Sequence, residues 1–181
     1  MQALTGTIEP ELGATIASAA AGDEGAFRRL VAAYHGEMHR VCVVVCGDQA
    51  IAEEAVQAAW AIAWRKLGTV RDPQRVRPWL TSVAVNQARN LIRKRRRRTE
   101  IEVLGDVPDH PGGVDPATGV DMLDLLAALR ALDSDERTLL AMRYVAGFNS
   151  TEIADAIGIS PSGVRNRLER LTTRLRRELQ A

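Results

Sequence analysis

Apolar side chains recur at helical spacing over most of the chain, and no stretch alternates apolar and polar residues as a half-buried strand does. Residues 24–46 follow Asp23, a residue type favoured at helix N-caps, and their apolar positions fall on one face. Gly47 ends this pattern, and Asp48 can cap a second helix that runs to about Leu67. The pattern therefore predicts an all-α fold.

A loop at 68–74 separates the second helix from a third, which begins at about Arg75 and ends in six consecutive cationic residues, 93–98. Residues 99–120 are rich in Pro, Gly and Asp and carry no helical stripe, which predicts a flexible acidic linker. Helices resume at about Met122. We therefore predict two small helical domains joined by this linker, at residues 1–98 and 121–181.

The C-terminal domain carries the strongest local motif. A short amphipathic helix is followed by Gly158, which allows a sharp turn, and by Ser160 as the N-cap of a second helix. The second helix buries an aliphatic stripe and offers polar side chains on its other face, which predicts a DNA-reading helix-turn-helix. The alternative is an ordinary helical hairpin with a solvated basic face. The polar positions are Ser162, Arg165, Asn166, Glu169 and Arg170.

Charge is distributed very unevenly along a chain whose formal net charge is only +1. Residues 65–98 hold 12 Lys and Arg against one Asp, whereas residues 99–136 hold one Arg against 10 acidic residues. The N-terminal 64 residues are net acidic and residues 137–181 are net basic. Two basic segments that alternate with two acidic ones indicate two anion-binding surfaces separated by an acidic connector.

The basic third helix also carries Trp79, Asn86 and Asn90, which are side chains able to stack on unpaired bases or to hydrogen-bond with them. The alternative is that Trp79 belongs to the core and that the cationic run is a solvated helix end. Composition alone favours the core position for this tryptophan.

Several classes of protein are disfavoured by what the sequence lacks. The first residues show neither a basic start nor a long apolar run, and no stretch is long enough to span a membrane, so we expect a cytoplasmic protein. No P-loop, GxSxG or HExxH motif occurs, so we expect no enzyme activity.

Two histidines and two cysteines lie on the first long helix, at His35, His39, Cys42 and Cys46. They spread along about 16 Å of helix, so they cannot all bind one tetrahedral ion. Two or three of them could share a metal with a ligand from elsewhere, but we expect packed side chains and no metal site. The two cysteines lie one helical turn apart, which disfavours a disulfide between them.

Four segments resemble, in order, those of extracytoplasmic-function (ECF) sigma factors, the smallest members of the bacterial sigma-70 family. They are "GDEGAFRRLVAAY", "AEEAVQAAWAIAWRKL", "VRPWLTSVAVNQARNLIRKRRRR" and "MRYVAGFNSTEIADAIGISPSGVRNRLERL". The resemblance covers residues 12–98 and 122–179. It implies a subunit that binds core RNA polymerase, recognises promoters and helps to open DNA for transcription initiation.

The resemblance implies three binding surfaces. The residues that would contact core polymerase, at the clamp helices of its largest subunit, are Glu53, Glu54, Gln57 and Trp60. Those that would capture and melt the −10 element are Arg77, Trp79, Asn86, Arg89, Asn90, Arg93, Lys94 and Arg95. Those that would read the −35 element as duplex are Ser162, Arg165, Asn166, Arg167, Glu169 and Arg170.

Further partners follow from the same resemblance: the polymerase flap region and an inhibitory anti-sigma protein, which many family members have. The linker would thread through polymerase towards the RNA exit path, and we hypothesise that it also shields the basic faces when polymerase is absent. We expect no catalysis, cofactor or metal in this subunit, no membrane contact, and a monomer when the protein is free.

Two other functions remain open from the sequence. A stand-alone helix-turn-helix regulator would bind duplex DNA by itself, usually as a dimer, but would not need the docking helix at residues 52–66. A helical adaptor that binds RNA through the run at 93–98 would leave the C-terminal motif unexplained. Dimerisation separates the regulator from the sigma factor.

Overall fold

The computed structural model describes residues 8–102, 128–129 and 131–179, and within them all regular structure is helical, as predicted. The long elements are α1 (Ile8–Ala20), α2 (Glu24–Cys46), α3 (Gln49–Lys66), α4 (Val76–Glu102), α6 (Ser134–Leu140), α7 (Ser150–Ile157) and α8 (Pro161–Glu178). The short elements are two 3₁₀ turns, Leu67–Thr69 and Pro73–Arg75, and a π-helical turn, Ala141–Val145. In the described part of the chain, no helix is both long and apolar enough to cross a membrane.

The ends of α2 and the start of α3 are set by the capping residues that the sequence predicts. The Asp23 carboxylate accepts hydrogen bonds from the backbone N–H groups of Gly25, at 2.7 Å, and Ala26, at 3.1 Å, and these bonds lower its pKa. Gly47 then ends α2 with φ at 67°, a left-handed conformation that suits glycine. Asp48 accepts from the Ile51 N–H at 3.0 Å and so caps α3.

Helix α1 was not among the predicted elements. It packs on α2 and on the 3₁₀ turns beside α4, and it buries Ile16 and Ala19. The signal was present in the sequence, because Leu12, Ile16 and Ala19 recur at helical spacing. An alanine-rich, short stripe next to the chain start was too weak to separate from an unstructured segment.

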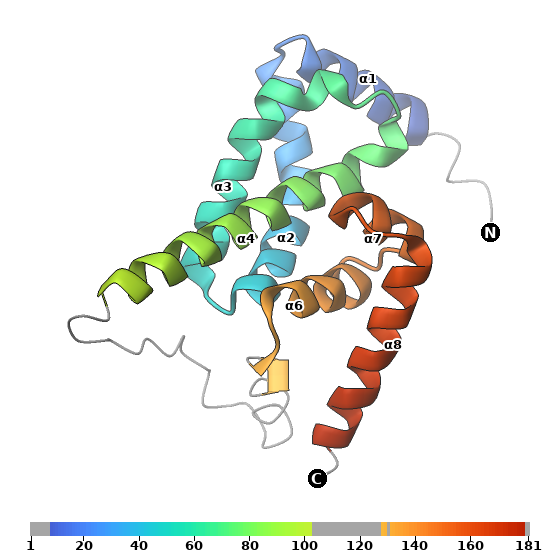
Figure 1. The fold of residues 1–181 in the computed structure, drawn as a ribbon. Coiled ribbons are helices and arrows are strands. Elements are labelled where there is room, and N and C mark those ends of the chain that lie inside the picture. The colour runs from blue at the N-terminus through green and yellow to red at the C-terminus, as the bar shows by residue number, and fades with distance from the viewer. Residues whose placement is uncertain (1–7, 103–127, 130, 180–181) are drawn as a thin grey trace, which may run out of the picture.

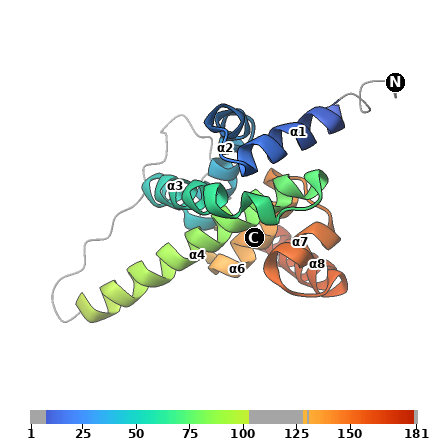
Figure 2. The ribbon, with the colours of Figure 1, turned by 90° about the horizontal axis from the view of Figure 1, so that it is seen from above.

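Helix α4 continues one turn beyond the cationic run, to Glu102, so the first four residues of the expected linker, 99–102, are helical. No Gly or Pro interrupts the chain before Gly105, so nothing in the sequence ends the helix at residue 98. The last turns of α4 extend past the other helices in two perpendicular views (Figure 1, Figure 2). The rest of the expected linker, 103–120, and the expected restart at Met122 lie outside the described residues.

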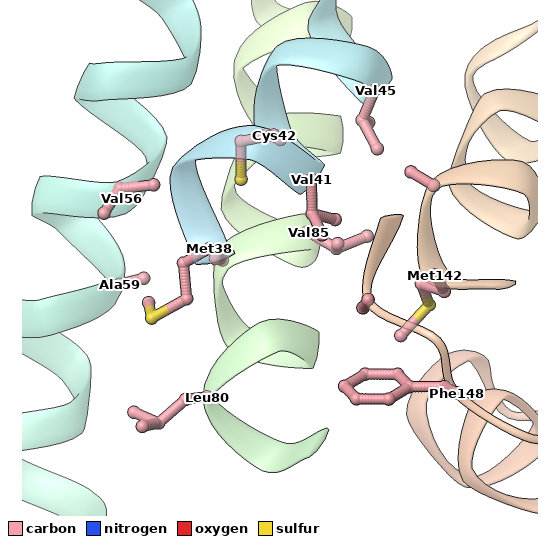
Figure 3. Packing of buried hydrophobic residues seen from close by; sticks show 14 of the residues in the cluster. Met38, Val41, Cys42, Val45, Val56, Ala59, Leu80, Val85, Met142 and Phe148 are labelled. Carbon is pink, nitrogen blue, oxygen red and sulfur yellow. The ribbon is translucent and has the colours of Figure 1, made fainter. Parts of the chain in front are cut away.

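We call α1–α4 the N-terminal unit and α6–α8 the C-terminal unit. Helices α2, α3 and α4 pack on one another, α6 and the π-helical turn pack on α2, and α7 packs on α4 (Figure 1). One hydrophobic cluster runs through both units. At their boundary Met142 and Phe148 lie beside Val45 and Val85 (Figure 3). The two predicted domains are therefore in direct apolar contact in this structure.

Candidate nucleic-acid interface

Helix α4 aligns most of the predicted −10 residues along one face. Trp79, Asn86, Asn90 and Arg93 are spaced by seven, four and three residues, which places them above one another on a helix. Asn86, Asn90 and Arg93 are exposed, as is Lys94 next to them, whereas Trp79 is half-buried against the core. We call these five residues the α4 surface. It combines exposed amides and cations with one partly accessible ring.

Two other predicted −10 residues are held by acidic partners within the N-terminal unit. Arg95 lies on a different side of α4 and donates to Asp48 at 3.2 Å. Arg77 makes a two-pronged ion pair with Glu37 of α2, with Nε 3.0 Å from Oε1 and the terminal nitrogen 2.9 Å from Oε2. Such fork-like pairing fixes the plane of the guanidinium.

Arginines of the N-terminal unit also reach the C-terminal unit. Arg77 donates to the Ala146 carbonyl, and its guanidinium carbon lies 4.9 Å from the centroid of the Phe148 ring, within cation–π distance. Arg89, the remaining predicted −10 residue, donates to Asp135 of α6 at 2.7 Å. Arg75, in the 3₁₀ turn before α4, pairs with Asp155 of α7. None of these contacts was predicted from the sequence.

A pocket of about 650 Å³ lies between the loop before α4 and helix α7. One wall carries Arg71, Trp79 and Ser82 of the N-terminal unit, and the other carries Glu152 and Asp155 of the C-terminal unit. The loop and the tryptophan therefore face carboxylates of the same chain.

The helix-turn-helix forms as predicted. Gly158 ends α7 with φ at 75°, and the Ser160 hydroxyl accepts from the Gly163 N–H at 3.1 Å to cap α8. An aliphatic stripe, with Val164 and Leu168 at its start, is buried. The predicted −35 residues are all exposed; they are Ser162, Arg165, Asn166, Arg167, Glu169 and Arg170, and we call them the α8 surface.

The predicted polymerase contacts on α3 divide between surface and core. Glu54 and Gln57 are exposed and Glu53 is partly exposed, with Gln57 donating to Glu53 at 3.1 Å. Trp60 instead lies in the core, and its ring meets that of Phe27 edge to face at 5.6 Å. The aromatic side chain that reaches the surface is Trp64, which is 41% exposed. Two tryptophans one turn apart could not be told apart by spacing alone.

The histidines and cysteines of α2 face different surroundings. Glu53 of α3 lies 4.0 Å from His35 Nε2 and 3.7 Å from His39 Nε2. Cys42 and Cys46 are free thiols, and burial raises the pKa of each to about 12. Because the thiolate is the reactive form, neither cysteine is activated as a nucleophile or redox centre.

Comparison with known proteins assigns the chain to a family. A model of sigma-70 region 2 matches residues 30–98, and a model of sigma-70 region 4 matches residues 122–175. The chain belongs to the sigma-70 family. Within that family it is an ECF sigma factor, the group to which its named relatives belong. Regions 2 and 4 are its parts for promoter recognition and transcription initiation.

Two curated relatives illustrate the match. The ECF RNA polymerase sigma factor SigL of Mycobacterium tuberculosis is 29% identical over 174 residues, which cover 92% of this chain and 96% of SigL. The probable RNA polymerase sigma factor RfaY of Xanthomonas campestris is 28% identical over 180 residues, 96% of this chain but 45% of RfaY. Proteins with these names are transcription regulators rather than enzymes.

Two solved structures share the fold of this sigma factor. The sigma factor RpoE of Bartonella quintana, in complex with the anti-sigma factor NepR, aligns with a TM-score of 0.72 at 20% identity. That alignment covers 86% of this chain and 97% of RpoE. CnrH, in complex with the cytosolic domain of CnrY, aligns with a TM-score of 0.68 at 24% identity and covers 92% of this chain and 95% of CnrH.

Proposed function

We propose that this sigma factor divides promoter recognition between its two units, with −10 capture on the α4 surface and −35 reading on the α8 surface. The observation that carries this proposal is that each matched region presents one exposed face of amide and cationic side chains, on α4 and on α8. Residues 1–98 then form the polymerase-docking and −10 domain, 99–120 the acidic linker, and 121–181 the −35 domain.

On the α4 surface, the Asn86 and Asn90 amides are exposed and can hydrogen-bond with the Watson–Crick edges of unpaired bases. Arg93 and Lys94 extend the same surface with cations that attract the backbone phosphates. Trp79 offers a partly accessible ring for stacking, while its other side packs on the core. Strand separation without ATP is then offset by base capture and phosphate attraction together.

On the α8 surface, the polar residues nearest the helix start lie where a recognition helix meets base edges in the major groove. Arg165 suits guanine, Asn166 suits adenine, and Glu169 accepts from the cytosine amino group. The cap by Ser160 holds the first turn in place, so these side chains project from a well-formed helix end.

Docking on core polymerase falls to α3. We place Glu53, Glu54 and Gln57 against the clamp helices of the largest subunit, with Trp64 supplying the aromatic contact in place of the buried Trp60. Exposed aromatic rings with neighbouring polar groups are typical of interface centres.

The further partners are the polymerase flap region, which the C-terminal unit would contact, and an anti-sigma factor. The two structural neighbours are complexes with NepR and with CnrY, which supports an inhibitor of that kind for this chain. We place the protein in the cytoplasm as a monomer when free, because its DNA and polymerase partners are there.

Size-exclusion chromatography with purified core polymerase tests the proposal. We expect one-to-one co-elution, which Glu54→Ala combined with Gln57→Ala abolishes, while the control Glu11→Ala on the exposed side of α1 leaves it intact. A chain that ignores core polymerase but shifts duplex DNA as a dimer would instead be a stand-alone regulator.

A further inference from the structure

The boundary between the two units carries a repeated charge arrangement. On the N-terminal side are arginines, and on the C-terminal side are carboxylates: Arg89 meets Asp135, and Arg75 meets Asp155. Both acids are more than half exposed, so neither is required to fill the core. A carboxylate on an arginine satisfies the same donors that would otherwise bind a phosphate.

The boundary also covers part of the predicted −10 site. The pocket between the loop before α4 and α7 places Glu152 and Asp155 across from Trp79. A strand bound along this wall would bring its phosphates next to two carboxylates, which repel them. Asn86, Asn90 and Arg93 farther along α4 stay exposed. The C-terminal unit thus blocks the start of the α4 surface and leaves its far end open.

The packed units are also too close together to use both surfaces at once. Elements named −35 and −10 lie about 25 base pairs apart, which is roughly 85 Å of duplex at 3.4 Å per base pair. A compact chain of 181 residues has a diameter of only about 40 Å. The α4 and α8 surfaces can reach their two elements only after the units separate.

We propose that the packing of α6–α8 on α2 and α4 is an autoinhibited state in which Asp135 and Asp155 stand in for promoter phosphates on Arg89 and Arg75. This inference rests on the proposed function. Separation of the units returns both arginines to the nucleic acid. Arg77 stays in place on Glu37, because both belong to the N-terminal unit, and gives up only Phe148 and the Ala146 carbonyl.

Two kinds of contact hold this state, and they differ in how they are broken. The ion pairs are partly exposed and are therefore weak and screened by salt. The apolar part is dry: Phe148 and Met142 are fully buried and lie beside Val45 and Val85 (Figure 3). Opening exposes this apolar surface, so it needs a partner that covers it or compensates for it. Core polymerase, which has to bind both units, is that partner.

Energy transfer between two dyes measures the separation directly. Ser18 on α1 and Thr173 on α8 are exposed, and Ser18→Cys with Thr173→Cys provides one dye position in each unit. The native thiols of Cys42 and Cys46 stay unlabelled at neutral pH, because burial keeps the pKa of both at about 12. We expect high transfer efficiency in the free chain and a clear fall when core polymerase is added.

The acidic residues are tested by Asp135→Asn combined with Asp155→Asn, in the same labelled chain. The matched control is Glu11→Gln combined with Glu178→Gln, which removes the same charge from positions away from the boundary. We expect the first variant to lower the efficiency without polymerase and to bind a single-stranded −10 oligonucleotide several-fold more tightly than the control. Equal efficiency and equal affinity in the two variants would overturn the role of the acids.

The outcomes separate this inference from the proposed function. If the chain binds core polymerase and the efficiency does not change, autoinhibition is wrong and the sigma-factor function stands. If the chain fails to bind polymerase, the proposed function is wrong. In that case a lower efficiency in the Asp135 and Asp155 variant would still show a boundary held by charge.

Discussion

The α4 and α8 surfaces present similar side chains but sit differently in the same molecule. Beside α4, Arg89 and Arg75 contact acids of the other unit, and the pocket at Trp79 is walled by α7. Beside α8, the neighbouring acids come from its own unit, as where Arg174 pairs with Glu136 at 2.8 Å. Separation of the units therefore changes the surroundings of α4 and leaves those of α8 as they are.

This difference indicates that the regulated step is −10 capture rather than −35 reading. Both surfaces attract nucleic acid by the same chemistry, and only the one that must hold unpaired bases is obstructed. A free chain that could melt DNA would act without polymerase, whereas duplex binding by α8 alone has little consequence. The following tests either remove the difference between the surfaces or measure it.

The largest effect is expected at the apolar boundary. Phe148→Ala removes a fully buried ring under Arg77 and should lower the free energy of unfolding by about 3–5 kcal/mol. Tyr144→Ala, at a ring that is 65% exposed, should change it by less than about 0.5 kcal/mol. Urea denaturation followed by circular dichroism measures both. Equal effects would mean that Phe148 does not belong to a shared core.

A reciprocal pair of variants should separate the two surfaces. Arg165→Ala should weaken binding of a −35 duplex by about 1–3 kcal/mol and leave capture of a −10 single strand unchanged. Asn86→Ala with Asn90→Ala should do the opposite, at about 0.5–1.5 kcal/mol for each hydrogen bond removed. Fluorescence anisotropy of the complex with core polymerase measures both. A variant that weakens both elements equally would show that the surfaces do not act independently.

The smallest effect concerns salt. Arg93→Gln with Lys94→Gln should reduce the slope of log affinity against log salt for the single strand by roughly 0.7 for each phosphate that is no longer neutralised. The control Arg28→Gln with Arg29→Gln, at exposed positions on α2, should leave the slope unchanged. An unchanged slope in the first variant would mean that Arg93 and Lys94 do not bind phosphates.

Local signals made most of the fold predictable. Asp23, Gly47 and Asp48 mark helix ends by chemistry that acts within three or four residues, and the structure has all three as caps. Gly158 and Ser160 do the same for the helix-turn-helix. The exposed members of the α4 and α8 surfaces follow from helical periodicity in the same way.

The features that were missed depend on contacts between distant residues. Whether Trp60 or Trp64 faces the core is decided by where Phe27 of α2 lies, and the sequence of α3 does not contain that information. Arg77 was predicted as a DNA contact because of its charge, yet Glu37 and Phe148 hold it in this structure. Such pairings appear only once two units pack, which periodicity and charge counts along one segment cannot reveal.

The continuous core has a consequence for how long unused copies of the protein persist. Phe148 and Met142 are inaccessible while the units are packed, so proteases and other apolar surfaces have little to bind there. A chain that opened without polymerase would present these side chains and become a target for degradation and aggregation. The packed form thus keeps a silent pool intact, and the amount of free polymerase sets how much of that pool is drawn into use.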